Sequence, residues 1–148
     1  MNSEHLREDL AAARWYGREL RLETFAQCRM TGLEAAQIRA ERLVFRDCRL
    51  DLANFRHATL RNVSFEDCVL DEADFGGADL SLTRFRGCSL LGVSFADARL
   101  TRVDLRGCAL APTTARSLRG AVISTTQLID LGPQLAADFG IVIEDTEP

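Results

Sequence analysis

Residues 73–82 read Ala-Asp-Phe-Gly-Gly-Ala-Asp-Leu-Ser-Leu, a five-residue unit written twice. The third residue of each unit is Phe75 or Leu80, and the same spacing continues in both directions along the chain. From Phe45 to Leu110 every fifth residue is Phe or Leu. The residues two positions before these anchors are small or branched. Self-similarity at a short, fixed period indicates a repeat architecture, in which each unit packs on its neighbours.

The five-residue period does not suit an ordinary helix or a straight strand. On a helix five residues turn the side chain through about 500°, so the anchors would be spread over every face. In a strand an odd step sends successive anchors to opposite faces. Short extended pieces joined by turns fit the pattern, because residues two apart then point the same way into a core. Glycines occupy the two positions after the anchor, where a turn is expected: Gly76, Gly77, Gly87, Gly92 and Gly107.

The cysteines predict the number of sides. All five are spaced by 20 residues, so a full coil should hold four units, one on each of four sides. The cysteines are Cys28, Cys48, Cys68, Cys88 and Cys108. Residues 23–112 contain 18 units and therefore form a rod of about four and a half coils. Consecutive coils should lie about 4.8 Å apart, the usual strand spacing.

The units at Ala73–Gly77 and Ala78–Leu82 resemble the A-[DN]-[LF]-x-x signature of the pentapeptide-repeat family, and the match extends over residues 23–112. The resemblance implies an all-β solenoid, a right-handed quadrilateral β-helix. Some members resemble B-DNA in width and charge and bind DNA gyrase or topoisomerase IV, giving quinolone resistance. In those members the C-terminal end mediates dimerisation, so the resemblance also implies a homodimer through this end.

Because the ends of a solenoid expose bare core and open sheet edges, we expect short α-helical caps. Residues 1–22 are the expected N-terminal cap. Leu6, Leu10 and Ala13 follow Ser3 at helical spacing and predict a helix over residues 3–13. An irregular coil should follow it, since Trp15 and Leu20 lie on the five-residue spacing.

Residues 113–148 are the expected C-terminal cap. Ser124 and Gln127 resemble a capping box, and the helix that follows should end at Gly140. A short strand, Ile141-Val142-Ile143, is expected to close the structure. The helix has an apolar face whose residues are the candidate dimer or cap contacts: Leu128, Leu131, Leu135 and Phe139.

The sequence favours binding over catalysis. A line of stacked thiols cannot surround a metal ion tetrahedrally, so we interpret the cysteines as small buried hydrophobic residues. His5 and His57 are far apart, and no glycine-rich phosphate loop, metal-spaced cluster or nucleophile elbow occurs. We therefore expect no enzyme, no cofactor and no bound metal.

Composition limits the partner. The chain has 22 acidic and 18 basic residues, and every basic residue is arginine. A net charge of −4 argues against direct nucleic-acid binding. No apolar stretch approaches the roughly 20 residues of a membrane span, and the first residues lack the layout of a signal peptide. We expect a cytoplasmic protein.

The outward positions carry the candidate partner-binding site. Between Arg61 and Arg84 the chain has six acids and no base. These acids form an acidic belt around one coil: Glu66, Asp67, Asp71, Glu72, Asp74 and Asp79. On the fourth side a column of arginines is expected: Arg39, Arg42, Arg61, Arg99 and Arg102. Both features are equally compatible with a merely solvated surface.

Two functions remain open. The first is a DNA mimic that binds a type II topoisomerase, which the acidic belt and the family resemblance favour. Its weak point is charge, since residues 23–112 contain 13 acids against 12 arginines, whereas about 20 Å of DNA carries roughly 12 negative charges. Residues 23–112 also lack the projecting loops of many resistance proteins. The second is a scaffold or adaptor that binds another cytoplasmic protein.

Overall fold

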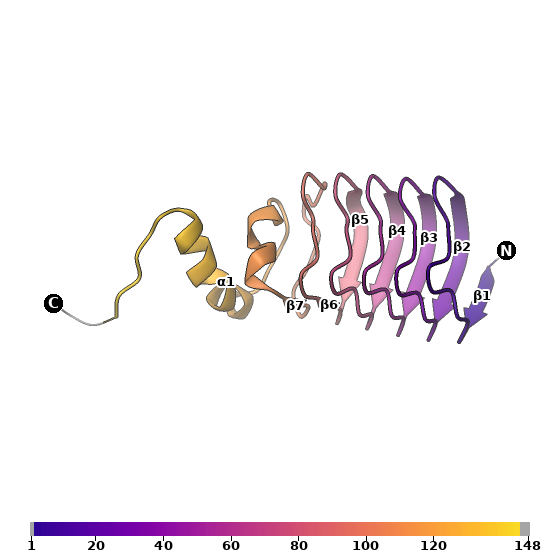
Figure 1. Ribbon diagram of the computed structural model, residues 1–148, viewed down its shortest axis with the longest axis horizontal. Coiled ribbons are helices and arrows are strands. Elements are labelled where there is room, and N and C mark those ends of the chain that lie inside the picture. The colour runs from indigo at the N-terminus through magenta and orange to yellow at the C-terminus, as the bar shows by residue number, and fades with distance from the viewer. Residues whose placement is uncertain (1, 146–148) are drawn as a thin grey trace.

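The computed structural model describes residues 2–145. They form an elongated rod with the N-terminus at one end and helices at the other (Figure 1). Five parallel strands make one sheet in chain order: β1 (Ser3–Leu6), β2 (Glu19–Ala26), β3 (Arg39–Arg46), β4 (Thr59–Glu66) and β5 (Asp79–Arg86). The short strands β6 (Ser89–Leu90) and β7 (Ala109–Leu110) pair with each other. A 3-10 helix, η1 (Pro112–Ser117), and the helix α1 (Thr125–Asp138) follow.

Successive coils are stacked with an offset of 20 residues. Ser3 pairs with Glu23, and Phe25 pairs with Phe45. Isolated parallel bridges with the same offset, such as Asn54 with Asp74, join the coils away from the main sheet. The 20-residue coil expected from the cysteines is therefore confirmed. The chain is a β-solenoid of slightly more than five coils, because residues 3–110 all follow this offset.

The anchors fill the core in four columns, which define the sides of the rod. Side one has Phe25, Phe45, Phe65 and Phe85, and side two has Met30, Leu50, Leu70 and Leu90. Side three has Phe55, Phe75 and Phe95, and side four has Leu20, Leu60, Leu80 and Leu100. All of these side chains are buried. Rings stack along a side, as in Phe45–Phe65 with centroids 4.9 Å apart, and meet edge to face across the core, as in Phe65–Phe75 at 6.1 Å. Both are favourable arrangements for aromatic pairs.

A left-handed residue makes each corner. From Arg7 to Gly107 the second residue after every anchor has positive φ, with Leu82 as the exception. Many of these residues are not glycine, for example Arg42 at 58° and Asp67 at 51°. At the corners after sides two and three, a backbone hydrogen bond closes the turn, as from Ala53 N–H to the Leu50 carbonyl (3.1 Å). The corner after side one has no such bond in residues 25–88, and we call it the open corner.

The expected N-terminal helix is wrong. Residues 3–13 contain β1 and complete a full first coil, so the rod begins 20 residues earlier than Glu23. His5 extends the aromatic column of side one, because its ring stacks on Phe25 with centroids 4.5 Å apart. Its ring nitrogens lie 2.8 Å from the carboxylate of Glu8 and 3.0 Å from that of Glu23. These contacts accommodate Glu23, a carboxylate at an inward position.

The C-terminal helix is present, but the strand expected after it is wrong. α1 starts with the predicted capping box of Ser124 and Gln127, and it continues through Pro133. The side-chain amide of Gln127 donates to the carbonyls of Leu105 (2.7 Å) and Cys108 (2.9 Å), which fixes the start of the helix on the last coil. Residues 141–145 are exposed and form no strand. Within residues 2–145 no helix is long and apolar enough to cross a bilayer.

Candidate partner-binding surface

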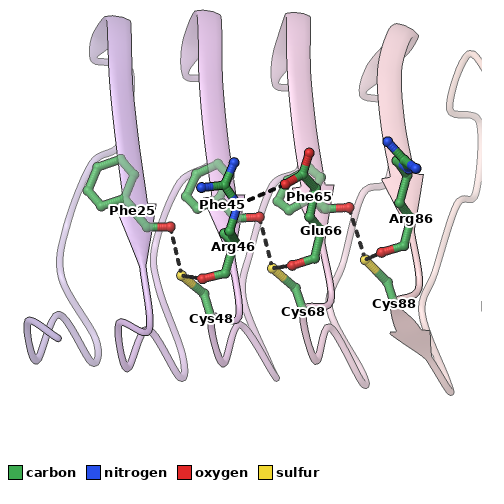
Figure 2. A network of polar contacts seen from close by, with 9 residues as sticks. All are labelled: Phe25, Phe45, Arg46, Cys48, Phe65, Glu66, Cys68, Arg86 and Cys88. Atoms are coloured by element: carbon green, nitrogen blue, oxygen red, sulfur yellow. Dashed lines mark hydrogen bonds and ion pairs between the residues drawn. The ribbon is translucent and has the colours of Figure 1, made fainter. Parts of the chain in front are cut away.

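The cysteine column lies at the open corner, where it provides hydrogen-bond donors. The Cys48 Sγ lies 3.3 Å from the Phe25 carbonyl oxygen, and the Cys88 Sγ lies 3.2 Å from that of Phe65 (Figure 2). Each thiol thus donates to the carbonyl of the anchor 23 residues earlier, where no turn hydrogen bond forms. Thr83 supplies a hydroxyl in the same way at the neighbouring corner, 3.2 Å from the Leu60 carbonyl.

The thiols therefore belong to the core. All five are free and buried, as the sequence predicted. Burial raises the pKa of the Cys28 thiol. Hydrogen bonding with the neighbouring Cys48 and Cys88, together with burial, raises the pKa of Cys68. Among the described residues no group of three or more His, Cys, Asp or Glu side chains could hold a metal ion.

The six acids of the acidic belt surround the coil of residues 63–82, and three of them are neutralised by arginines. Glu66 lies 3.0 Å from Arg46. Asp74 lies 3.1 Å from Arg56. Asp79 lies 3.9 Å from Arg99. Hydrogen bonds from Ser81, and next the nearby Arg99, hold the pKa of Asp79 below its usual value.

The other three acids of the belt, Asp67, Asp71 and Glu72, border side two. Asp71 accepts hydrogen bonds from the Ser89 hydroxyl (2.6 Å) and the Leu91 N–H (3.0 Å) and has no arginine partner among the described residues. Asp67 and Glu72 are exposed. The uncompensated charge of the belt is therefore concentrated on one side of the rod.

The stacking of coils adds two further carboxylates to this region. Asp47 lies one coil before Asp67, and Asp51 lies one coil before Asp71, as the neighbouring bond from Leu52 N–H to the Asp71 carbonyl (2.9 Å) shows. Together these residues form what we call the side-two acidic surface: Asp47, Asp51, Asp67, Asp71 and Glu72. Arg49, at 3.7 Å from Asp51, is its nearest ion-pair partner among the described residues.

The arginine column of side four is mixed with acids. Arg39 lies 3.7 Å from Glu19, and Arg99 pairs with Asp79. Glu41 in the same column lies 3.4 Å from Arg21. Arg42, Arg61 and Arg102 have no ion pair within 4.0 Å among residues 2–145. Side four is thus less basic than a count of its arginines suggests.

The candidate dimer contacts on α1 differ in exposure. Leu131 is buried, with 1% of its surface exposed, and packs beneath the helix. Leu135 is half-buried. Leu128 is 50% exposed and Phe139 is 80% exposed. The helix therefore caps the rod through Leu131 and leaves apolar surface uncovered.

Comparison with known proteins agrees with the repeat architecture. The family model described as "Pentapeptide repeat region" matches residues 20–95. No curated protein matches the chain.

Three solved structures are similar to the chain. A trypsin-treated QnrB1, described as a plasmid-mediated fluoroquinolone resistance protein, is 18% identical, with 97% of this chain and 100% of that chain covered and a TM-score of 0.27. Rfr23 from the cyanobacterium Cyanothece 51142 is 15% identical over 83% of this chain and 86% of its own, with a TM-score of 0.36. AT2G44920 from the Arabidopsis thaliana thylakoid lumen is 23% identical over 84% and 91%, with a TM-score of 0.21. These likenesses do not bear on a partner.

Proposed function

Because this chain belongs to the pentapeptide repeat family, whose model matches residues 20–95, we propose that it is a non-catalytic rod that binds another protein in the cytoplasm. The anchors and the cysteines are fully committed to the core. The outward side chains are therefore the groups through which the rod can engage a partner. On a solenoid these positions form long, regular surfaces suited to binding.

The partner that we propose is DNA gyrase or topoisomerase IV, which the rod would engage as a DNA mimic, with a quinolone-resistance-like effect. The observation that carries this proposal is the side-two acidic surface, where carboxylates recur in adjacent coils. Coils about 4.8 Å apart place these charges at intervals comparable with the phosphates of one DNA strand, about 3.4 Å apart along the helix axis. Hydroxyl groups accompany two of these carboxylates, since Thr31 donates to Asp51 (2.8 Å) and Ser89 to Asp71.

A gyrase supercoiling assay tests this proposal. Purified protein is titrated into the reaction with and without a quinolone, beside the variant Asp67→Arg/Glu72→Arg. Both substituted positions are exposed, and the left-handed corner that they occupy accepts arginine at Arg42 and Arg102. We expect the wild type to inhibit supercoiling or protect the enzyme at micromolar concentration, and the variant to require at least about 10-fold more protein, because repulsion replaces attraction.

The matched control is Glu4→Arg/Asp97→Arg, which makes the same change in charge at exposed positions outside the side-two acidic surface. It should behave like the wild type. If the wild type has no effect on gyrase or topoisomerase IV, the topoisomerase proposal is wrong, and the scaffold or adaptor function is the one that remains. Equal losses in both variants would mean that total charge, rather than this surface, determines binding.

We further propose that two copies associate through their C-terminal ends. The exposed Leu128 and Phe139, beside the half-buried Leu135, supply apolar surface for such a contact. Exposed apolar groups that are contiguous commonly mark interaction sites. Sedimentation equilibrium on the wild type and on Leu128→Ser/Phe139→Ser tests the association, and a monomer for the wild type at all concentrations would contradict it.

A further inference from the structure

A groove separates β5 from the last coil. β5 is the outer strand of its sheet. Within residues 2–145 no backbone hydrogen bond joins residues 81–87 to residues 101–107, one coil further on. The resulting open groove has a volume of about 600 Å³. Elsewhere along the rod the equivalent segments are bonded to each other, so the groove is a local departure from the repeat.

Different corners on its two walls account for the groove. In the last coil, turn hydrogen bonds join Val103 N–H to the Leu100 carbonyl (2.8 Å) and Cys108 N–H to the Leu105 carbonyl (3.1 Å). In the earlier coils a strand runs through the first of these corners, and the second is the open corner. On the other wall, the register of β5 shifts so that Arg61 pairs with Leu82. Walls of unequal shape cannot form a continuous ladder.

The groove leaves a strand edge unpaired. On side one, the second residue after the anchor donates its N–H to the next coil, as Gln27 does to the Arg46 carbonyl (2.9 Å) and Asp67 to the Arg86 carbonyl (2.8 Å). Gly87 is the equivalent residue of the following coil, and its N–H has no such acceptor among the described residues. An open edge of this kind is a template for an added strand.

The groove is also basic. Four arginines line it with one acid: Arg84, Arg86, Arg102, Arg106 and Asp104. Arg106 is bound to Asp104 by hydrogen bonds of 2.9 and 2.8 Å. Arg84, Arg86 and Arg102 are exposed and have no ion pair among residues 2–145. Arg46 pairs with Glu66 in the next coil, whereas the residue one coil beyond Arg86 is Arg106. The groove therefore suits an extended chain that carries carboxylates.

The chain itself contains such a segment. Residues 141–145 are Ile-Val-Ile-Glu-Asp, three β-branched residues followed by two acids. β-branched residues favour strands, yet this segment is extended without a partner and fully exposed, with Val142 at 78%. Figure 1 shows it leaving α1 away from the rod and from β5. The groove of a different molecule is therefore its natural partner.

We propose that residues 141–145 of one copy add as a strand to β5 of a second copy, with Glu144 and Asp145 facing Arg84, Arg86 and Arg102. This inference rests on the proposed association of two copies through their C-terminal ends, but it assigns the contact to strand pairing in the groove instead of the face of α1. Exchange of both segments about a two-fold axis gives a closed dimer, because each groove is filled by the other copy.

Charge reversal and its rescue test the exchange in the full chain. Sedimentation equilibrium should show a dimer for the wild type. Arg84→Glu/Arg86→Glu and Glu144→Arg/Asp145→Arg should each weaken the dimer at least about 10-fold, because like charges then meet in the groove. The chain carrying all four substitutions should recover to within a few-fold of the wild type. Thermal melting confirms that each variant is folded.

The control Arg14→Glu/Arg18→Glu makes the same change in charge on exposed residues of the first coil, and it should dimerise normally. A second variant lacks residues 141–148 and should be monomeric. If it remains a dimer, or if the four-substitution chain does not recover, strand exchange is wrong and association through α1 stands. A monomeric wild type would contradict both, while leaving the topoisomerase proposal to its own assay.

Discussion

Substitution Phe65→Ala tests whether the aromatic columns hold the coils together. Phe65 is fully buried and is surrounded by four rings, with centroids 4.9 Å (Phe45), 5.2 Å (Phe85), 5.9 Å (Phe55) and 6.1 Å (Phe75) away. Truncation of a buried phenylalanine costs about 3–5 kcal/mol. Four lost ring contacts place Phe65→Ala near the upper end, about 5 kcal/mol. The total free energy of unfolding expected for 148 residues is about 7–20 kcal/mol.

Phe95→Ala is the matched comparison. Phe95 is equally buried, but it meets only Phe75 (5.6 Å) and Phe85 (6.2 Å). Each aromatic pair contributes about 0.5–1.5 kcal/mol beyond burial, so Phe65→Ala should be less stable than Phe95→Ala by about 1–3 kcal/mol. Phe139→Ala, at an exposed site on the same chain, should leave the free energy of unfolding almost unchanged.

Urea unfolding followed by far-ultraviolet circular dichroism and by the fluorescence of Trp15 measures these differences. Trp15 is the single tryptophan and lies in the first coil. Coincident transitions from the two probes would show that the rod unfolds as one unit. Equal losses for Phe65→Ala and Phe95→Ala, or a loss under about 1 kcal/mol for Phe65→Ala, would refute the assignment of stability to ring stacking.

Two further outcomes concern the open corner and the last coil. Cys68→Ala should lower the free energy of unfolding by about 2–3 kcal/mol, because the Phe45 carbonyl loses its donor at 3.3 Å, whereas Cys68→Thr should cost less, since Thr83 makes the same contact with a hydroxyl; equal melting temperatures for the two variants would contradict the donor role. Side-chain hydrogen bonding to Arg106 lowers the pKa of Asp104 to about 2, so its contribution to stability is complete above the unfolded pKa of about 3.9 and is lost as the pH falls toward 2. Asp104 is half exposed, so the effect is small, but urea midpoints between pH 4 and pH 2 should fall more steeply for the wild type than for Asp104→Asn, and parallel curves would speak against it.

The inward half of the fold could be predicted because its determinants repeat. Anchors every five residues and cysteines every 20 are sufficient to give the coil. The N-terminal helix was mispredicted because Leu6, Leu10 and Ala13 also satisfy helical spacing, while the anchor of that coil is His5, a polar ring. Its place in the column depends on stacking with Phe25 and on the carboxylate of Glu23. Neither contact is visible until two coils lie side by side.

The candidate surface was only partly predictable for the same reason. The belt read along the chain has no arginine, yet Glu66 and Asp79 are paired with residues 20 positions away, Arg46 and Arg99. The 20-residue spacing alone could have revealed those pairs. The groove could not have been predicted, because it depends on which corners close with a hydrogen bond. Likewise, the β-branched run 141–143 has strand propensity but no strand edge within reach in the single molecule.

The offset between coils has a consequence for how this rod can change in length. Duplication of a 20-residue segment such as 43–62 would insert one coil, lengthen the rod by about 4.8 Å and leave every outward column in place. Insertion of five residues would also keep all later anchors pointing inward, but it would rotate the following coils by a quarter turn. Asp67, Asp71 and Glu72 would then move to the next side. Folding thus reads the sequence in fives, whereas the outer surface reads it in twenties, so small insertions can rearrange the surface of the rod while preserving its core.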